Sequence, residues 1–157
     1  MQGADIYLCR AKAKENKEWA EGLLCPPTYP GHIGENWHIA VENTNLFGCE
    51  CKVWIYEEID IDTLCKASGR RDRNNTLIYT GDIVRTWYCE SKRDKENKGA
   101  YKPREGLFEV VLHKLTCGLE SVKTGSICFY VSTFESHELE IIGNIHDNPA
   151  LLERSTT

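Results

Sequence analysis

The sequence lacks the long apolar runs and the export signal that would place it in or beyond a membrane. None of its apolar runs approaches the ~20 residues that a membrane-spanning helix needs. Residues 1–20 contain no apolar segment after a basic start, so we predict no signal peptide. We therefore expect a cytoplasmic protein whose eight cysteines stay reduced. Most of these cysteines have apolar neighbours in the sequence, which favours buried thiols acting as small hydrophobic side chains.

The sequence also lacks the short motifs that define common enzyme classes. It contains no G-x4-G-K-[ST] or G-x-G-x-x-G phosphate loop, and no G-x-S-x-G nucleophile elbow. No histidine or cysteine stands in a local pattern that marks an activated nucleophile. We therefore predict no catalytic residue and no cofactor, and we expect a protein that works by binding rather than by catalysis.

An excess of basic charge is missing as well. The chain has 24 acidic and 19 basic residues, which gives a net charge of -5. Proteins that bind bulk nucleic acid usually carry a basic surface, because neutralising phosphates supplies most of their affinity. This balance disfavours nucleic acid as the main partner, although it is compatible with a local basic patch.

The 157 residues fit one domain, which we predict over 1–157. Short segments of alternating apolar and polar residues, separated by turn signals, predict a mainly β fold at the margin of α+β. We expect a small barrel or sandwich of short strands with one or two short helices. The predicted strands cover residues 4–8, 19–24, 37–41, 53–56, 77–79, 83–88, 107–115, 127–134 and 139–142.

Two further segments are predicted from composition. Residues 91–106 hold six Lys or Arg and three Asp or Glu, which is typical of a mobile charged loop. Residues 148–153 predict a short helix that has Asn148 as N-cap and Pro149 as its first residue, with a frayed tail from 154.

Two groups of residues have side chains that could bind a metal ion. Cys49 and Cys51, with His32 and His38 upstream, are weak zinc candidates, because C-x-C is not the C-x2-C spacing of zinc ribbons. We therefore predict no metal site there. Asp60 and Asp62 would share one face of an extended segment, where they could hold a divalent ion in a phosphodiesterase.

The strongest candidate binding site is a group of basic residues near a glycine turn. Arginine binds phosphate through two parallel hydrogen bonds, and a tryptophan ring stacks on bases. The same charges are also compatible with a solvated turn. The residues predicted to bind an anionic ligand are Arg70, Arg71, Arg73, Arg85 and Trp87.

Two longer segments carry a family resemblance. Residues 65–84 (CKASGRRDRNNTLIYTGDIV) and residues 139–152 (LEIIGNIHDNPALL) resemble, in order, the central and C-terminal signatures of YopX-like phage proteins. The opening segment, with Arg10 and Trp19, also fits. Asn75 replaces the usual turn glycine, and Thr80 replaces an acidic residue; asparagine still tolerates a positive φ.

The resemblance implies a phage or prophage protein that lies in the host cell cytoplasm, forms a homo-oligomer and has no assigned biochemical activity. The signature residues also have structural explanations, because Gly, Asp and Asn are typical of turns and caps. The residues predicted to fix the fold are Gly69, Asp72, Asn74, Gly81, Asp82, Gly143, Asn144, Asn148 and Pro149.

Three functions follow as hypotheses. The first is a non-enzymatic phage accessory protein that binds a host component; as an anti-defence protein it would sequester a small anionic ligand or cap a host protein. The second is a nucleic-acid-associated protein of phage replication or regulation. The third is a metal-dependent phosphodiesterase that uses Asp60 and Asp62.

Overall fold

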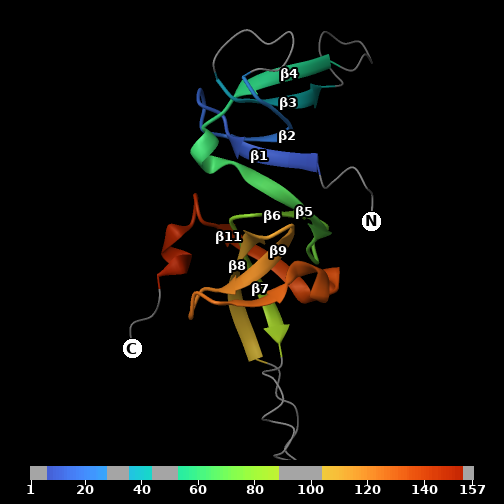
Figure 1. Cartoon of the computed structure of the whole chain (residues 1–157), viewed down its shortest axis with the longest axis vertical. Helices are drawn as coiled ribbons and strands as arrows, with labels where there is room; N and C mark the ends of the chain where they lie inside the picture. Colours follow the sequence, from blue (N-terminus) through green and yellow to red (C-terminus); the bar gives the residue numbers. More distant parts are fainter. Residues whose placement is uncertain (1–6, 28–35, 44–52, 89–103, 154–157) are drawn as a thin grey trace, which may run out of the picture. The chain divides into compact units, whose positions relative to one another are not determined.

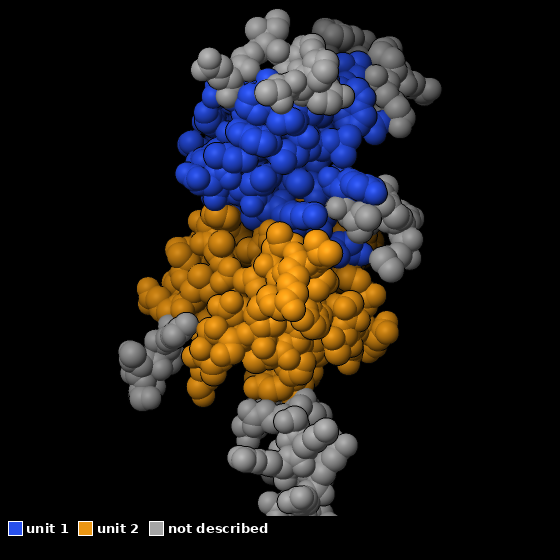
Figure 2. Space-filling view, in the orientation of Figure 1, with its two compact units in different colours: residues 1–69 blue, residues 70–157 orange. Residues whose placement is uncertain are grey.

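The computed structural model describes residues 7–27, 36–43, 53–88 and 104–153. Contacts within the chain divide it into two compact units, residues 1–69 and residues 70–157, which Figure 2 shows in blue and orange. This division into compact units does not test the prediction of one domain over residues 1–157, which stays a prediction. Each unit is described by itself.

Unit 1 is built on antiparallel strands. They are β1 (Leu8–Lys12), β2 (Trp19–Cys25), β3 (His38–Asn43), β4 (Val53–Glu58) and β5 (Cys65–Arg71), with a 3-10 helix, η3 (Ile61–Thr63), before β5. The strand order is β4-β3-β2-β1-β5, so β4 lies at one edge (Figure 1). The hairpin of β1 and β2 pairs Arg10 with Glu21 and Lys12 with Trp19.

The core of unit 1 contains small side chains. Ala11, Ala20, Ile39 and Ile59 are buried together. Alternation along β1 places Ala11 inward and directs Arg10 and Lys12 outward, where both cations lie over the Trp19 ring, 4.7 and 5.5 Å from its centroid. Gly22 is required at its position, because a Cβ there would lie 2.1 Å from the Ala40 carbonyl oxygen.

Unit 2 contains the second sheet. Its strands are β7 (Asp82–Tyr88), β8 (Arg104–His113), β9 (Thr116–Ser121), β10 (Ile127–Tyr130) and β11 (Leu139–Asn144). All pairings are antiparallel, in the order β10-β9-β8-β7-β11. The short strand β6 (Leu77–Tyr79) instead pairs with β5, whose last two residues, Arg70 and Arg71, belong to unit 2. Three 3-10 helices complete the unit: η5 (Val131–Thr133), η6 (Ser136–Glu138) and η7 (Pro149–Leu152).

The core of unit 2 is larger and aromatic. Phe108 and Phe134 are buried, and Tyr88 and Phe129 pack against them. Phe129 meets Phe108 and Phe134 edge to face at centroid distances of 5.9 and 5.5 Å, a preferred aromatic geometry. The other buried residues of this core are Ile78, Val84, Val110, Cys117, Leu119, Val131 and Leu139.

The prediction of a mainly β fold with short helices is confirmed. The described strands form two open antiparallel sheets, not a closed barrel. The predicted helix over 148–153 is the 3-10 helix η7, with Asn148 as its N-cap residue and Pro149 as its first residue.

Several predicted details were wrong. The first described strand begins at Leu8, where the predicted strand 4–8 ended, and the strand predicted over 127–134 ends at Tyr130, before the 3-10 helix η5. Residues 104–106 belong to β8 and not to a loop, because their backbone pairs with residues 86–88 of β7. Residues 65–71 form the strand β5, although the composition of residues 67–76 predicted turns, and residues 116–121 form the strand β9, for which no strand was predicted. Both segments are polar and contain glycine, which hides their alternation. Cys128 is exposed because it lies on β10, an edge strand, whereas Cys25 and Cys65 are buried as predicted.

Two carboxylates face each other across β8 and β9. Glu109 and Glu120 are register partners beside a cavity of about 150 Å³ that Leu152 also lines. Burial, and then the charge of Glu120, raise the pKa of Glu109. Because this pKa is raised in the folded state, the repulsion is fully present above that pKa and is relieved as the pH falls through it.

We predict that Glu109→Gln raises the free energy of unfolding at pH 7 by about 0.5 kcal/mol, because like charges directly opposite destabilise a sheet. The gain should shrink as the pH is lowered toward the ordinary glutamate pKa of 4.5. Urea denaturation across this pH range measures it, with the exposed Glu153→Gln as control. A gain that does not change with pH would contradict the assignment.

Candidate functional site

The arginine turn lies between β5 and β6. Asn75, with a φ of 63°, shapes this turn of residues 72–76, and Gly69, with a φ of 73°, lies before the turn, within β5. Only glycine and a few polar residues adopt this conformation readily, so Asn75 takes the place of a turn glycine as predicted. The turn closes through hydrogen bonds from Asp72 N to Thr76 O and from Asn75 N to Asp72 O.

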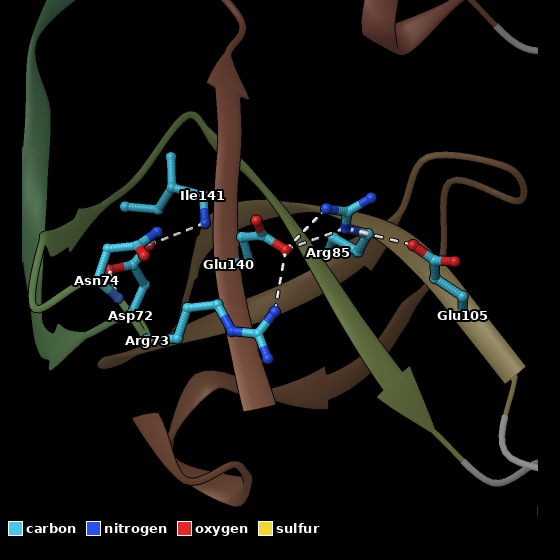
Figure 3. A network of polar contacts seen from close by, with 7 residues as sticks. All are labelled: Asp72, Arg73, Asn74, Arg85, Glu105, Glu140 and Ile141. Carbon is cyan, nitrogen blue, oxygen red and sulfur yellow. Dashed lines mark hydrogen bonds and ion pairs between the residues drawn. The ribbon is translucent and has the colours of Figure 1, made fainter. Parts of the chain in front are cut away.

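The buried carboxylate of Asp72 joins this turn to β11 (Figure 3). Its side chain accepts hydrogen bonds from the backbone N–H groups of Asn74 and Thr76, both at 2.9 Å, and of Ile141 at 3.1 Å. The Asn74 amide adds a fourth, longer bond, and Arg73 N donates to Leu139 O at 2.9 Å. Asp72 is 3% exposed, so its charge is balanced by N–H donors instead of water.

Glu140 connects two of the predicted arginines (Figure 3). Its Oε2 accepts from Arg85 Nη2 at 2.8 Å and lies 3.4 Å from Arg73 Nη1. Arg85 also lies 3.3 Å from a Glu105 carboxylate oxygen. The hydrogen bond with Arg85 lowers the pKa of Glu140 and raises that of Arg85, so both stay charged at neutral pH.

The remaining arginines bind backbone carbonyls. Arg70 Nη2 donates to Phe134 O, and Arg71 Nη1 donates to Asn75 O at 3.0 Å. Trp87 is 55% exposed on β7, opposite Glu105 and on the same side of the strand as Arg85. A phosphate approaching Arg73 or Arg85 must therefore compete with Glu140 and Glu105. Binding of an anionic ligand at these five residues stays a prediction.

The other predicted signature residues form two further turns. Gly81 has a φ of 81°, and the buried Asp82 carboxylate accepts from Tyr79 N at 2.8 Å. β11 ends at Asn144, whose side-chain oxygen accepts from the N–H groups of His146 and Asp147.

Asn148 packs against the end of β11. A Cβ at Gly143 would lie 2.5 Å from Asn148 Oδ1, which itself accepts from Asn144 N at 3.2 Å. This close approach explains the glycine. The Asn148 side chain therefore bonds backward, to β11, instead of capping the first turn of η7.

Most residues of the zinc hypothesis lie outside the described part of the chain, and the geometry of Asp60 and Asp62 does not match the divalent-ion hypothesis. Cys49, Cys51 and His32 lie outside the described residues, and His38 lies on β3 with its Nδ1 2.9 Å from Asn36 O. Asp60 is the N-cap of η3 and its side chain accepts a hydrogen bond from Asp62 N. The prediction of an extended segment that aligns the two carboxylates was therefore wrong. Among the described residues no three His, Cys, Asp or Glu side chains gather as metal ligands.

The sequence reasoning missed an exposed apolar surface on unit 1, here called the outer face. Leu23 pairs with Ala40, and Ala40 pairs with Tyr56, so the three side chains cross β2, β3 and β4 in one row. Trp54 lies on the same side of β4, two residues before Tyr56. Leu23, Trp54 and Tyr56 are 42%, 46% and 48% exposed. The signal was the run Val53-Trp54-Ile55-Tyr56, which is apolar on both sides of the strand.

An acidic hollow adjoins this face. It has a volume of about 430 Å³ and is lined by Lys14, Glu15, His38, Tyr56, Glu57 and Glu58. Lys14 Nζ lies 2.8 Å from Glu58 Oε1, and this bond lowers the pKa of Glu58. Within the described part of the chain, Glu15 and Glu57 have no cationic partner.

The fold defines a mainly β protein in which the arginine turn and β11 are joined through the Asp72 carboxylate. The family model described as YopX protein matches residues 9–153, so this chain belongs to the YopX family. The expected family resemblance is thereby confirmed.

The other comparisons add little. The crystal structure of protein EF1440 from Enterococcus faecalis is similar over 92% of this chain and 96% of that chain, at 20% identity and a TM-score of 0.46. A comparison with curated proteins found no match. None of the described helices has the length and apolar character to span a bilayer.

We predict that Asp72→Asn lowers the free energy of unfolding by about 2 kcal/mol, because an amide puts an N–H₂ group where N–H donors need an acceptor. Thermal or urea denaturation measures the loss. Asp62→Asn, an exposed aspartate of η3, is the control and should change stability by less than about 0.5 kcal/mol. Equal stability of the two variants would contradict the role of Asp72.

Proposed function

We propose that this protein is a non-catalytic accessory protein of a phage or prophage that acts by binding a protein of the host cell. The observation that carries the proposal is the outer face, where Leu23, Trp54 and Tyr56 are each more than two-fifths exposed on one side of a sheet. Contiguous exposed apolar side chains on a protein surface often mark an interaction site. Tryptophan and tyrosine are also the residues enriched in protein interfaces.

The charge distribution favours a protein partner over an anionic one. Residues 1–69 contain six Lys or Arg and eleven Asp or Glu, whereas residues 70–157 contain 13 of each, so unit 1 carries the whole net charge of -5. In unit 2 the exposed arginines Arg73 and Arg85 are already paired with carboxylates. An acidic surface repels phosphate, so nucleic acids and small anions are less favourable ligands than a protein.

Capping a host defence protein is the form of this function that we favour. Capping requires an exposed binding surface and no catalytic turnover, and the outer face is an exposed apolar surface. Sequestration of a small anion at Arg70, Arg71, Arg73, Arg85 and Trp87 is the alternative. That ligand would have to displace Glu140 from Arg85, so its affinity should fall steeply with salt.

We predict that affinity purification from the bacterial host captures a host protein, and that Trp54→Ser combined with Tyr56→Ser abolishes the capture. The physical reason is the loss of two large apolar contacts at the centre of the interface. Quantitative mass spectrometry measures the capture. Trp87→Ser, which removes an exposed tryptophan of unit 2, is the matched control and should retain it. A partner held equally by all three proteins, or none above background, would contradict the proposal.

We also propose that the chain forms a homo-oligomer through unit 2. The hairpin of β8 and β9 exposes Leu112 of β8 at 57% and Leu115, in the turn between the two strands, at 101%. Two exposed leucines three residues apart on one hairpin form a small apolar patch, and contiguous apolar patches mark interaction sites.

We predict that Leu112→Ser with Leu115→Ser lowers the subunit number seen by native mass spectrometry. Trp54→Ser with Tyr56→Ser should leave that number unchanged, because it alters the other unit. A monomeric wild-type protein would contradict self-association. The reverse pattern of the two variants would assign the contact to the outer face.

A further inference from the structure

We propose that the 3-10 helix η7 is a proton-sensitive strap on the sheet of unit 2. It docks more tightly when the carboxyl pair of Glu109 and Glu120 holds a proton, and it loosens when both groups are charged. Three features carry this inference: the register of the two carboxyl groups, the cavity that they share with η7, and the contacts that attach η7 to β11. The proposal concerns unit 2 alone and does not rest on the proposed host partner.

The first feature is the position of the two carboxyl groups. Glu109 of β8 and Glu120 of β9 are register partners, so their side chains lie on the same side of the sheet. Their partners on the outer flanks are apolar, because Ile83 of β7 pairs with Glu109 and Ile127 of β10 pairs with Glu120. Two like charges thus face each other between apolar residues, and a single proton relieves their repulsion.

The charged groups around the pair do not compensate it. Among the described residues, neither carboxyl group forms a hydrogen bond or an ion pair. Burial raises the pKa of Glu109, the charge of Glu120 raises it further, and no described cation offsets these two effects. Arg85, the cation on the same side of β7, is paired with Glu140 and Glu105. The other charged or titratable groups of the surrounding elements are Lys123 in the turn after β9, His146 and Asp147 before η7, and Glu153 after it.

The second feature is the cavity beside the pair. Its volume is about 150 Å³, and its lining includes both carboxyl groups, Gly125 of the turn after β9, and Leu152 of η7. An apolar side chain beside a carboxyl group favours the neutral form, because it keeps water away from the charged one. Docking of Leu152 and ionisation of the pair therefore oppose each other.

The third feature is the attachment of η7 to β11, which involves few contacts. Asn148 N donates to Asn144 O, and Asn148 Oδ1 accepts from Asn144 N at 3.2 Å. A Cβ at Gly143 would lie 2.9 Å from Leu151 Cδ1, so Leu151 also lies against the strand. No residue of η7 is fully buried. Segments with few buried contacts open locally at low free energy, so a modest change in charge beside Leu152 shifts the balance between docked and open.

The direction of the effect follows from linkage. If docking raises the pKa of Glu109, protonation of Glu109 must favour docking by the same factor. The additional docking free energy is fully present below the pKa of the open state, and it is lost as the pH rises through the raised pKa of the docked state. The strap is therefore tightest in acid and loosest at neutral and higher pH.

Amide hydrogen exchange of the full-length protein between about pH 5 and about pH 7.5 tests the inference. The amides of Leu151 and Glu153 donate to carbonyl groups of Asn148 and Ala150, so they report the opening of η7. After correction for intrinsic exchange rates, their protection should rise about threefold toward the acidic end, the size expected of a like-charge pair in a sheet. Low urea separates this local opening from global unfolding. Protection that does not change with pH would overturn the proposal.

Two variants assign the effect to the pair. Glu109→Gln combined with Glu120→Gln should keep η7 docked at every pH, with the protection that the wild type reaches only in acid. The control, Asp62→Asn with Glu21→Gln, removes two exposed carboxylates of unit 1 and should keep the wild-type pH dependence. A pH dependence that persists in the first variant, or disappears in the control, would contradict the assignment to Glu109 and Glu120.

Leu152→Ser provides the reciprocal measurement. If η7 raises the pKa of Glu109 by covering it, this variant should lower that pKa toward the ordinary glutamate value of 4.5, which NMR of the carboxyl carbon follows. A purely structural contact between η7 and the sheet would leave the titration of Glu109 unmoved. An unchanged pKa in Leu152→Ser would therefore overturn the coupling between the strap and the proton.

Discussion

One buried carboxylate holds the signature segments of this chain together. Asp72 lies between the arginine turn and β11, and three backbone N–H groups point at it. Two of those groups belong to its own turn, and the third belongs to Ile141, 69 residues later. Because a buried charge without such donors is strongly unfavourable, the carboxylate constrains the turn and β11 together. The two family signatures are therefore two halves of one structural feature.

This constraint also explains the arginines. Once the turn lies against β11, Arg73 N bonds to Leu139 O and its side chain comes within reach of Glu140. Arg85 approaches the same carboxylate because β7 pairs with β11, Glu140 opposite Arg85. The basic cluster that the sequence presents is thus largely neutralised where it is exposed. The surface features left over lie elsewhere: the outer face with its acidic hollow in unit 1, and the hairpin leucines in unit 2.

Local chemistry made much of the fold predictable. Gly69, Gly81 and Asn75 have the positive φ expected of turn residues, and the Asp72, Asp82 and Asn144 side chains bind backbone N–H groups near them. These are effects over a few residues, so a single sequence contains them. The Arg85–Glu140 pair and the Asp72–Ile141 bond depend on strand pairing across more than 50 residues, which no local pattern specifies.

The outer face was unpredictable for a related reason. An apolar run such as Val53-Trp54-Ile55-Tyr56 is typical of a strand buried on both sides, and only the sheet order reveals that β4 is an edge strand. The strands β5 and β9 were missed because their polar side chains and glycines hide the alternation.

Native-state amide hydrogen exchange tests most directly whether Asp72 joins the two signature segments into one cooperative unit. If it does, the amides of Thr76 and Ile141, which share this carboxylate, should exchange with the same free energy of opening and the same dependence on denaturant. Exchange of Thr76 by a low-energy local opening, while Ile141 stays protected to global unfolding, would show that the turn and β11 open independently and would contradict it.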